Sequence, residues 1–203
     1  MQPIARPAFI AALIGPIQSV AGWLIAGSLW PGYDPIKLTI SDLAAPESPV
    51  RWVMSAFFIL GGTLTLIAGV YARSFAMPGR IALVVAGICT YGITIFPTPL
   101  IGYSIPHRIF AITSFVLTAA WPLLAMRRHP AAPRILRPPA MMLATALQTA
   151  LAIWFLSTWT DPAQTAVGLW ERVVTTTQAR YLSAVVIVVY LAQRRSKTDP
   201  VLG

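Results

Sequence analysis

Apolar segments of about 20 residues recur along the chain, each long enough to cross the ~30 Å hydrocarbon core of a bilayer as a helix that rises ~1.5 Å per residue. This recurrence of long apolar segments limits the possible folds more than any other feature of the sequence. The segments do not alternate between polar and apolar residues, as the strands of a membrane β-barrel would. The sequence therefore predicts transmembrane α-helices.

Six such segments are present, and we expect one helix from each. Their approximate ranges are 8–30, 52–72, 81–103, 107–126, 139–159 and 175–193. Pro97 and Pro99 fall near the end of the third segment and should break or bend its last turn. No internal repeat and no second domain is visible. We therefore predict an all-α membrane protein, a compact bundle of about six transmembrane helices that forms a single domain over residues 1–203.

The composition agrees with a membrane protein and argues against nucleic-acid binding. Only 10% of the residues are charged and 57% are hydrophobic. The formal net charge is +9, but the basic residues form short clusters between the apolar segments and no stripe interleaved with aromatic residues. Cys89 is the single cysteine and lies inside an apolar segment, so no disulfide within the chain and no cysteine-based metal site is expected.

The distribution of basic residues predicts the orientation. Ten of the fifteen lie in four segments on one side of the predicted membrane, around residues 6, 73–80, 127–137 and 194–197. Five of the six acids lie on the other side, and Asp199 is the exception. Because basic loops stay in the cytoplasm, we expect both termini inside, the loop 31–50 outside, and a multi-pass protein of the inner or plasma membrane.

Several short motifs resemble those of a known family. They are Pro31-Gly-Tyr-Asp34, Thr39-Ile-Ser-Asp-Leu43, Phe57-Phe-Ile-Leu-Gly-Gly62, Phe96-Pro97, His107 and Gly168-Leu-Trp-Glu-Arg172. With these motifs in this order, the chain resembles the prokaryotic integral membrane family catalogued as domain of unknown function 998. It departs from the family at Ala44-Ala45, where a glycine is common, and at Arg108, where a small residue is usual. The resemblance implies a six-helix fold but no settled function.

Polar residues of the predicted outer side are the candidates for a functional site. We expect several of them to converge on one outward-facing cavity. The candidate catalytic residues are Asp34, Asp42, Glu171 and His107, and the candidate substrate-binding residues are Arg180, Arg172, Ser41, Tyr33, Trp30 and Trp170.

A local structural role competes with function at several of these positions. Asp34 precedes a proline and suits a turn, and Ser41 or Asp42 suits the cap of a short helix. Glu171 and Arg172 would also suit an ion pair at the membrane interface. We expect both residues in the last outer loop, around residues 168–173.

Three polar residues fall inside the predicted hydrocarbon region. Arg180 lies 14 residues before Arg194, or ~21 Å along a helix. A charge at this depth either snorkels outward or faces a protein interior with a partner. Gln18 and Gln148 fall near the middle of the membrane by the same reasoning and suit hydrogen bonds between helices or the floor of a cavity.

The residues available exclude some reaction mechanisms. The sequence has no glycine-rich nucleotide loop and no His-Glu-x-x-His, and its two histidines, His107 and His129, lie on opposite sides of the predicted membrane. A zinc hydrolase is therefore not expected, and a serine hydrolase would depend on Ser41 with His107 as its base. We expect no metal and no cofactor.

Two functions from different classes remain. The first is a small membrane enzyme that acts on an isoprenoid or other lipid by metal-independent acid–base chemistry, such as an isomerase or a proton-initiated terpene cyclase. The second is a non-enzymatic protein, either a small transporter or an accessory protein that binds lipid or a partner. The expected partners are membrane lipids and a hydrophobic or prenyl small molecule. The oligomeric state does not follow from the sequence.

Overall fold

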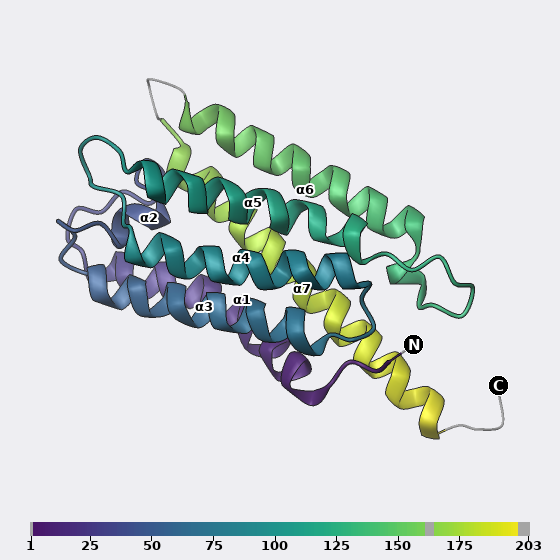
Figure 1. The fold of residues 1–203 in the computed structure, drawn as a ribbon. Coiled ribbons are helices and arrows are strands. Elements are labelled where there is room, and N and C mark those ends of the chain that lie inside the picture. Colours follow the sequence, from purple (N-terminus) through teal and green to yellow (C-terminus); the bar gives the residue numbers. More distant parts are fainter. Residues whose placement is uncertain (1, 161–164, 199–203) are drawn as a thin grey trace.

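The computed structural model describes residues 2–160 and 165–198, the last three of them by their backbone alone, and is all-helical over these ranges (Figure 1). The six long helices are α1 (Arg6–Ser28), α3 (Arg51–Tyr71), α4 (Met77–Ile95), α5 (Ile105–Ala125), α6 (Pro138–Trp159) and α7 (Val167–Thr198). A short helix α2 (Ile40–Leu43) lies in the loop between α1 and α3, and the 3₁₀ turn η1 (Arg134–Leu136) precedes α6. All six long helices are long and apolar enough to cross a membrane, which confirms the predicted fold class.

Prolines explain where several helices begin. Pro7, Pro78, Pro106 and Pro139 occupy the first turns of α1, α4, α5 and α6, where a proline has no intrahelical N–H bond to lose and its fixed φ suits the helix. The predicted helix 81–103 is wrong at both ends, because α4 begins at Met77 and already ends at Ile95. Pro97 and Pro99 follow that end, in a loop that leads to α5.

The last helix differs most from its prediction. We expected residues 175–193, whereas α7 runs over Val167–Thr198. The segment 168–173, expected in a loop, therefore forms the first turns of α7. Charged residues at a helix end resemble a loop in sequence, because the pattern does not show that the rest of the protein buries them. Asp161 and Asp199 lie outside the described residues.

The six long helices form a closed ring. In sequence order α1, α3, α4, α5, α6 and α7 each contact the next helix, and α7 returns to α1. Helices α3 and α4 approach each other closely, since a Cβ added to Gly62 would lie 2.9 Å from the carbonyl oxygen of Gly87. Small residues allow such close packing in a bilayer, where dispersion contacts take the place of the hydrophobic effect. A ring encloses a centre, and the candidate site lies there.

Hydrogen bonds close the end of the bundle that carries the termini. Arg127 donates through Nε to the carbonyl of Ser74 (2.9 Å) and through Nη2 to that of Phe75 (2.8 Å). Gln193 of α7 accepts from the N–H of Ile4 (3.0 Å) and donates to the Ser74 hydroxyl (2.7 Å). Both termini lie at this end and α2 lies at the opposite end (Figure 1). Which end faces the cytoplasm stays a prediction from the basic residues.

Cysteine labelling tests this orientation. Pro49 and Ala131 are exposed and lie at opposite ends of the bundle, which makes them suitable positions in a Cys89→Ser background. A membrane-impermeant maleimide added to intact cells should modify Pro49→Cys and leave Ala131→Cys unmodified until the cells are lysed. The reverse pattern would place the termini outside and the α2 end in the cytoplasm.

Candidate functional site

Arg172 fixes the loop between α1 and α3 to the start of α7. Its side chain is buried, with 6% of its surface exposed. Nη1 donates to the carbonyls of Pro35 (2.8 Å), Leu38 (3.0 Å) and Gly168 (2.7 Å), and Nη2 donates to the hydroxyl of Tyr33. Carbonyl oxygens thus compensate the buried guanidinium, as a charge inside a protein requires.

Glu171, the neighbour of Arg172, holds the next part of the same loop. Its carboxylate is also 6% exposed. Oε2 accepts a hydrogen bond from the N–H of Ile40, and Oε1 accepts one from the Ser41 hydroxyl (3.3 Å). Glu171 and Arg172 therefore bind different groups of the loop. Neither side chain forms the ion pair that we considered between them.

Two further contacts set the distance between the loop and α7. The N–H of Leu169 donates to the carbonyl of Ile36 (3.0 Å). A Cβ added to Gly168 would lie only 2.1 Å from the Leu38 oxygen, so this position accepts no side chain without moving the loop. We call this set of contacts between residues 33–41 and 168–172 the loop clamp.

Tyr33 also belongs to the loop clamp. Its hydroxyl accepts from Arg172 and donates to the carbonyl of Thr39 (2.8 Å). Burial raises the pKa of the Tyr33 hydroxyl, although the Arg172 charge works in the opposite direction. Trp30 stacks on Tyr33 with ring centroids 5.4 Å apart. Both aromatic residues, expected to bind substrate, thus pack within the protein's own loop.

A capping box forms helix α2 within this loop. Thr39 is the N-cap, and its hydroxyl accepts from the N–H of Asp42 (3.0 Å), while the Asp42 carboxylate accepts from the N–H of Thr39 (2.7 Å). The capping role weighed for Asp42 is therefore real, with Thr39 rather than Ser41 as the N-cap. Burial raises the pKa of the Asp42 carboxyl, and the hydrogen bonds to Thr39 partly oppose the rise.

A cavity of about 160 Å³ lies beside α2, between the loops at that end of the bundle. We call it the polar cavity. It brings together four predicted site residues from three separate elements, Ser41 and Asp42 of α2, His107 of α5 and Glu171 of α7. Lys37 and Arg108 also line it. The expected convergence of distant polar residues thus occurs for this subset.

His107 has a defined orientation in the polar cavity. Its ring is buried at the first turn of α5, and Nδ1 lies 3.0 Å from the carbonyl oxygen of Phe96. A carbonyl only accepts, so Nδ1 carries the proton and Nε2 keeps its lone pair in the neutral ring. Phe96 lies where α4 ends, so the early end of that helix positions the imidazole.

A second, larger cavity of about 220 Å³ lies inside the ring of helices. We call it the central cavity. Aromatic side chains from α3 and α5 form much of its wall, namely Phe57, Phe58, Phe115 and Trp121. Its volume exceeds the ~150 Å³ of an engineered cavity that binds benzene. Four residues border both cavities, so the two spaces adjoin, and these residues are Ser41, Ala111, Phe115 and Glu171.

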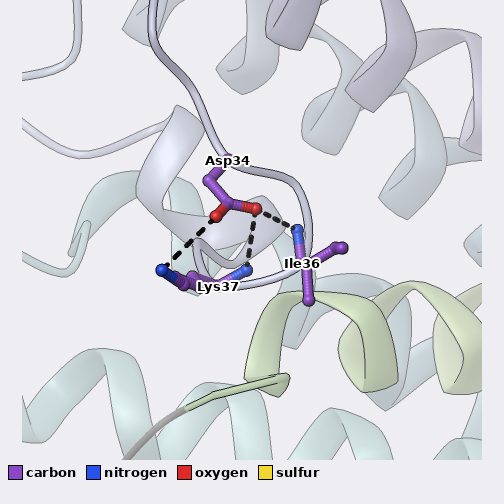
Figure 2. Close-up of polar contacts among 3 residues, drawn as sticks. All are labelled: Asp34, Ile36 and Lys37. Atoms are coloured by element: carbon purple, nitrogen blue, oxygen red, sulfur yellow. Dashed lines mark hydrogen bonds and ion pairs between the residues drawn. The ribbon is translucent and has the colours of Figure 1, made fainter.

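Six of the predicted site residues line neither cavity. Arg172, Tyr33 and Trp30 pack at the loop clamp, as described above, and the other three lie elsewhere. Asp34 points back into its own loop, where Oδ1 accepts from the N–H of Ile36 (2.9 Å) and Oδ2 lies 3.9 Å from Nζ of Lys37 (Figure 2). Arg180 lies on an exposed face of α7. Trp170 packs against Trp154, with ring centroids 5.2 Å apart. The single cavity that we expected therefore includes neither Asp34 nor Arg180.

Sequence reasoning missed most residues of the central cavity, although Gln18, expected at a helix contact or a cavity floor, does line it. The aromatic side chains that line it have the same residue types as those that face lipid, so no sequence signal separates them. Gln178 was detectable, because an amide in the middle of an apolar segment is costly unless the protein buries it with a partner. Among the described residues, no three His, Cys, Asp or Glu side chains group as metal ligands would.

Comparison with known proteins identifies the family. A model of the family described as protein of unknown function, DUF998, matches residues 13–189. The chain belongs to this family. No curated protein and no solved structure matches it. In this DUF998 protein, three of the motifs that carried the resemblance meet in the loop clamp, since Tyr33, residues 39–41 and residues 168–172 bind one another. The family motifs of this chain thus include residues that bind the loop to the start of α7.

Removing the Arg172 guanidinium tests the loop clamp. Arg172→Ala leaves three carbonyls and the Tyr33 hydroxyl without their donor, and we expect a loss of about 3 kcal/mol or more in unfolding free energy. This should appear as a lower midpoint of thermal unfolding in detergent. Arg180→Ala removes an exposed arginine of the same helix and should leave the midpoint unchanged or raise it. Equal midpoints for Arg172→Ala and the parent would show that the clamp does not stabilise the fold.

Proposed function

We propose that this DUF998 protein is a membrane-embedded enzyme that acts on an isoprenoid or other lipid-like molecule by acid–base chemistry. One observation carries the proposal. Titratable side chains from α2, α5 and α7 line a polar cavity that borders an apolar, aromatic cavity inside the bundle. An apolar substrate held in the central cavity would have to extend past the shared wall, which Phe115 and Glu171 help to form, to reach Asp42 and His107 in the polar cavity.

Asp42 suits the role of proton donor. Burial raises the pKa of its carboxyl, which favours the protonated form that an acid catalyst needs. His107 suits the role of base, because the hydrogen bond of Nδ1 to Phe96 leaves the lone pair of Nε2 available. Glu171, at the shared wall, keeps Ser41 in place.

The proposed chemistry is balanced without a co-reactant. In an isomerisation or cyclisation, Asp42 adds a proton to an alkene and His107 removes a proton from a neighbouring carbon, so the product has the formula of the substrate. Phe57 and Phe115 line the central cavity, and Phe115 also borders the polar cavity, where the intermediate carbocation would form. Aromatic faces attract cations by about 0.5–2 kcal/mol each.

A second candidate is a non-enzymatic role, as a small transporter or as an accessory protein that binds a lipid or partner. The loop clamp favours it, because Glu171 and Arg172 bind groups of the protein itself. Both candidates require a ligand in the central cavity. They differ in whether the protein converts the bound ligand to a product.

Turnover separates the two candidates. Purified protein in nanodiscs would be incubated with prenyl alcohols, prenyl diphosphates and phospholipids, and products followed by mass spectrometry and chromatography. Asp42→Asn keeps an oxygen that accepts from the Thr39 N–H, so we expect intact folding with turnover about 100-fold lower and binding largely retained. His107→Gln should show the same loss of turnover with folding and binding retained. Glu47→Gln, a change at an exposed acid of the same loop, is the matched control and should keep full activity. Binding without any conversion by the parent protein would favour the second candidate.

A further inference from the structure

Two glutamine side chains present unpaired amide atoms at the central cavity. Gln18 of α1 and Gln178 of α7 both line it. Oε1 of Gln18 and Nε2 of Gln178 are buried and have no hydrogen-bond partner among the described residues. Gln178 is only 7% exposed, and its Oε1 accepts from the Thr118 hydroxyl (2.9 Å), which holds the amide in place. A buried amide without a partner costs free energy that a ligand group can recover.

The two amides lie at nearly the same depth. Gly15 of α1 faces Ser183 of the antiparallel α7, since a Cβ added to Gly15 would lie 3.5 Å from the Ser183 hydroxyl oxygen. Gln18 is three residues, or ~4.5 Å, nearer the α2 end along α1. Gln178 is five residues, or ~7.5 Å, nearer that end along α7. The amides are therefore within ~3 Å of each other in depth, on two neighbouring helices.

The free atoms define the chemistry of a complementary group. Gln178 has a free donor and Gln18 a free acceptor, so one group that accepts and donates satisfies both. A hydroxyl does this, whereas an ether or ketone oxygen would leave Gln18 unpaired. Glu171 is the only titratable side chain that lines the central cavity within the described chain, so an anionic group would have no cation there. The Glu171 carboxylate already accepts from Ile40 and Ser41, so a cationic group would compete with these bonds.

The geometry also limits the size of the ligand. Glu171 and Gln178 are seven residues apart, which places them on one face of α7 about 10 Å apart along its axis. The cavity volume of about 220 Å³ is below the ~300–1,000 Å³ of sites for drug-sized molecules. A short isoprenoid fits these limits, and a diacyl phospholipid exceeds them.

We infer that the central cavity binds a small, uncharged isoprenoid-sized alcohol, with its hydroxyl between Gln18 and Gln178 and its hydrocarbon part extending toward Glu171. This inference rests on the proposed function and specifies the ligand of the same site. It places the alkene carbons near the shared wall, beyond which Asp42 and His107 line the polar cavity.

Three ligands of similar size test the hydroxyl. Geraniol donates and accepts, geranyl methyl ether only accepts, and the hydrocarbon myrcene does neither. Each would be titrated calorimetrically into the purified full chain in detergent, with the titration into detergent alone subtracted. We expect geraniol to bind about tenfold more tightly than the ether, and the ether more tightly than myrcene, because each lost hydrogen bond to a buried partner costs about a factor of ten.

Glutamine variants assign this preference to the central cavity. Gln178→Leu should weaken geraniol binding about tenfold and leave myrcene binding nearly unchanged. Gln18→Leu provides a second, independent variant with the same expectation. Gln148→Leu is the matched control, because Gln148 of α6 is 2% exposed, finds no partner for either amide atom in the described part of the chain, and lines neither described cavity. It should bind geraniol like the parent.

The outcomes distinguish this inference from the function on which it rests. Equal affinities for geraniol and myrcene, unchanged in Gln178→Leu and Gln18→Leu, would overturn the alcohol site and leave an apolar-ligand enzyme in place. The amides would then bind only water. Failure of all three ligands to bind the parent would overturn the alcohol site together with the proposed isoprenoid substrate.

Discussion

The burial of two opposite charges at the start of α7 is the interaction on which the α2 end of the protein depends. Neither charge neutralises the other directly. Arg172 is compensated by carbonyl oxygens of the loop and of its own helix, and Glu171 by an N–H and a hydroxyl of the same loop. A loop that supplies these groups has to fold against α7, because either charge left unpaired inside the protein would cost several kcal/mol. The position of α2, and with it Asp42, follows from this requirement.

The clamped loop also forms part of the lining of the two adjoining cavities. Ser41 and Glu171 border both, which makes the loop clamp part of the wall as well as part of the fold. This double use explains why structural and chemical roles are hard to separate at Glu171. Asp42 and His107 are easier to interpret. Each is fixed by its own local hydrogen bonds, to Thr39 and Phe96, and is not needed to hold the loop to α7.

Four of the ten candidate residues line the polar cavity, and the errors among the others have a common cause. Asp34, Asp42 and Glu171 are all acids that we predicted on one side, yet a turn uses Asp34 and only the other two line the polar cavity. On α7, Arg172 and Arg180 are eight residues apart, so the helix turns them about 80° from each other. That rotation puts Arg172 in the loop clamp and Arg180 on the exposed face. Sequence spacing gives the angle between residues but not which side faces the bundle.

The sequence by itself determined the number and helical state of the membrane spans, but not the bounds of α4 and α7. Each segment satisfies its own backbone within a helix and matches the thickness of the bilayer, and both properties are local. Only the tertiary structure decided which faces of these helices meet. α1 and α6 have almost no amphipathic pattern, so apart from Gln18 and Gln148 their sequences do not distinguish a face toward lipid from a face toward the ring. The central cavity and the pairing of Gln18 with Gln178 at one depth therefore arise from packing between helices distant in sequence, which local composition does not encode.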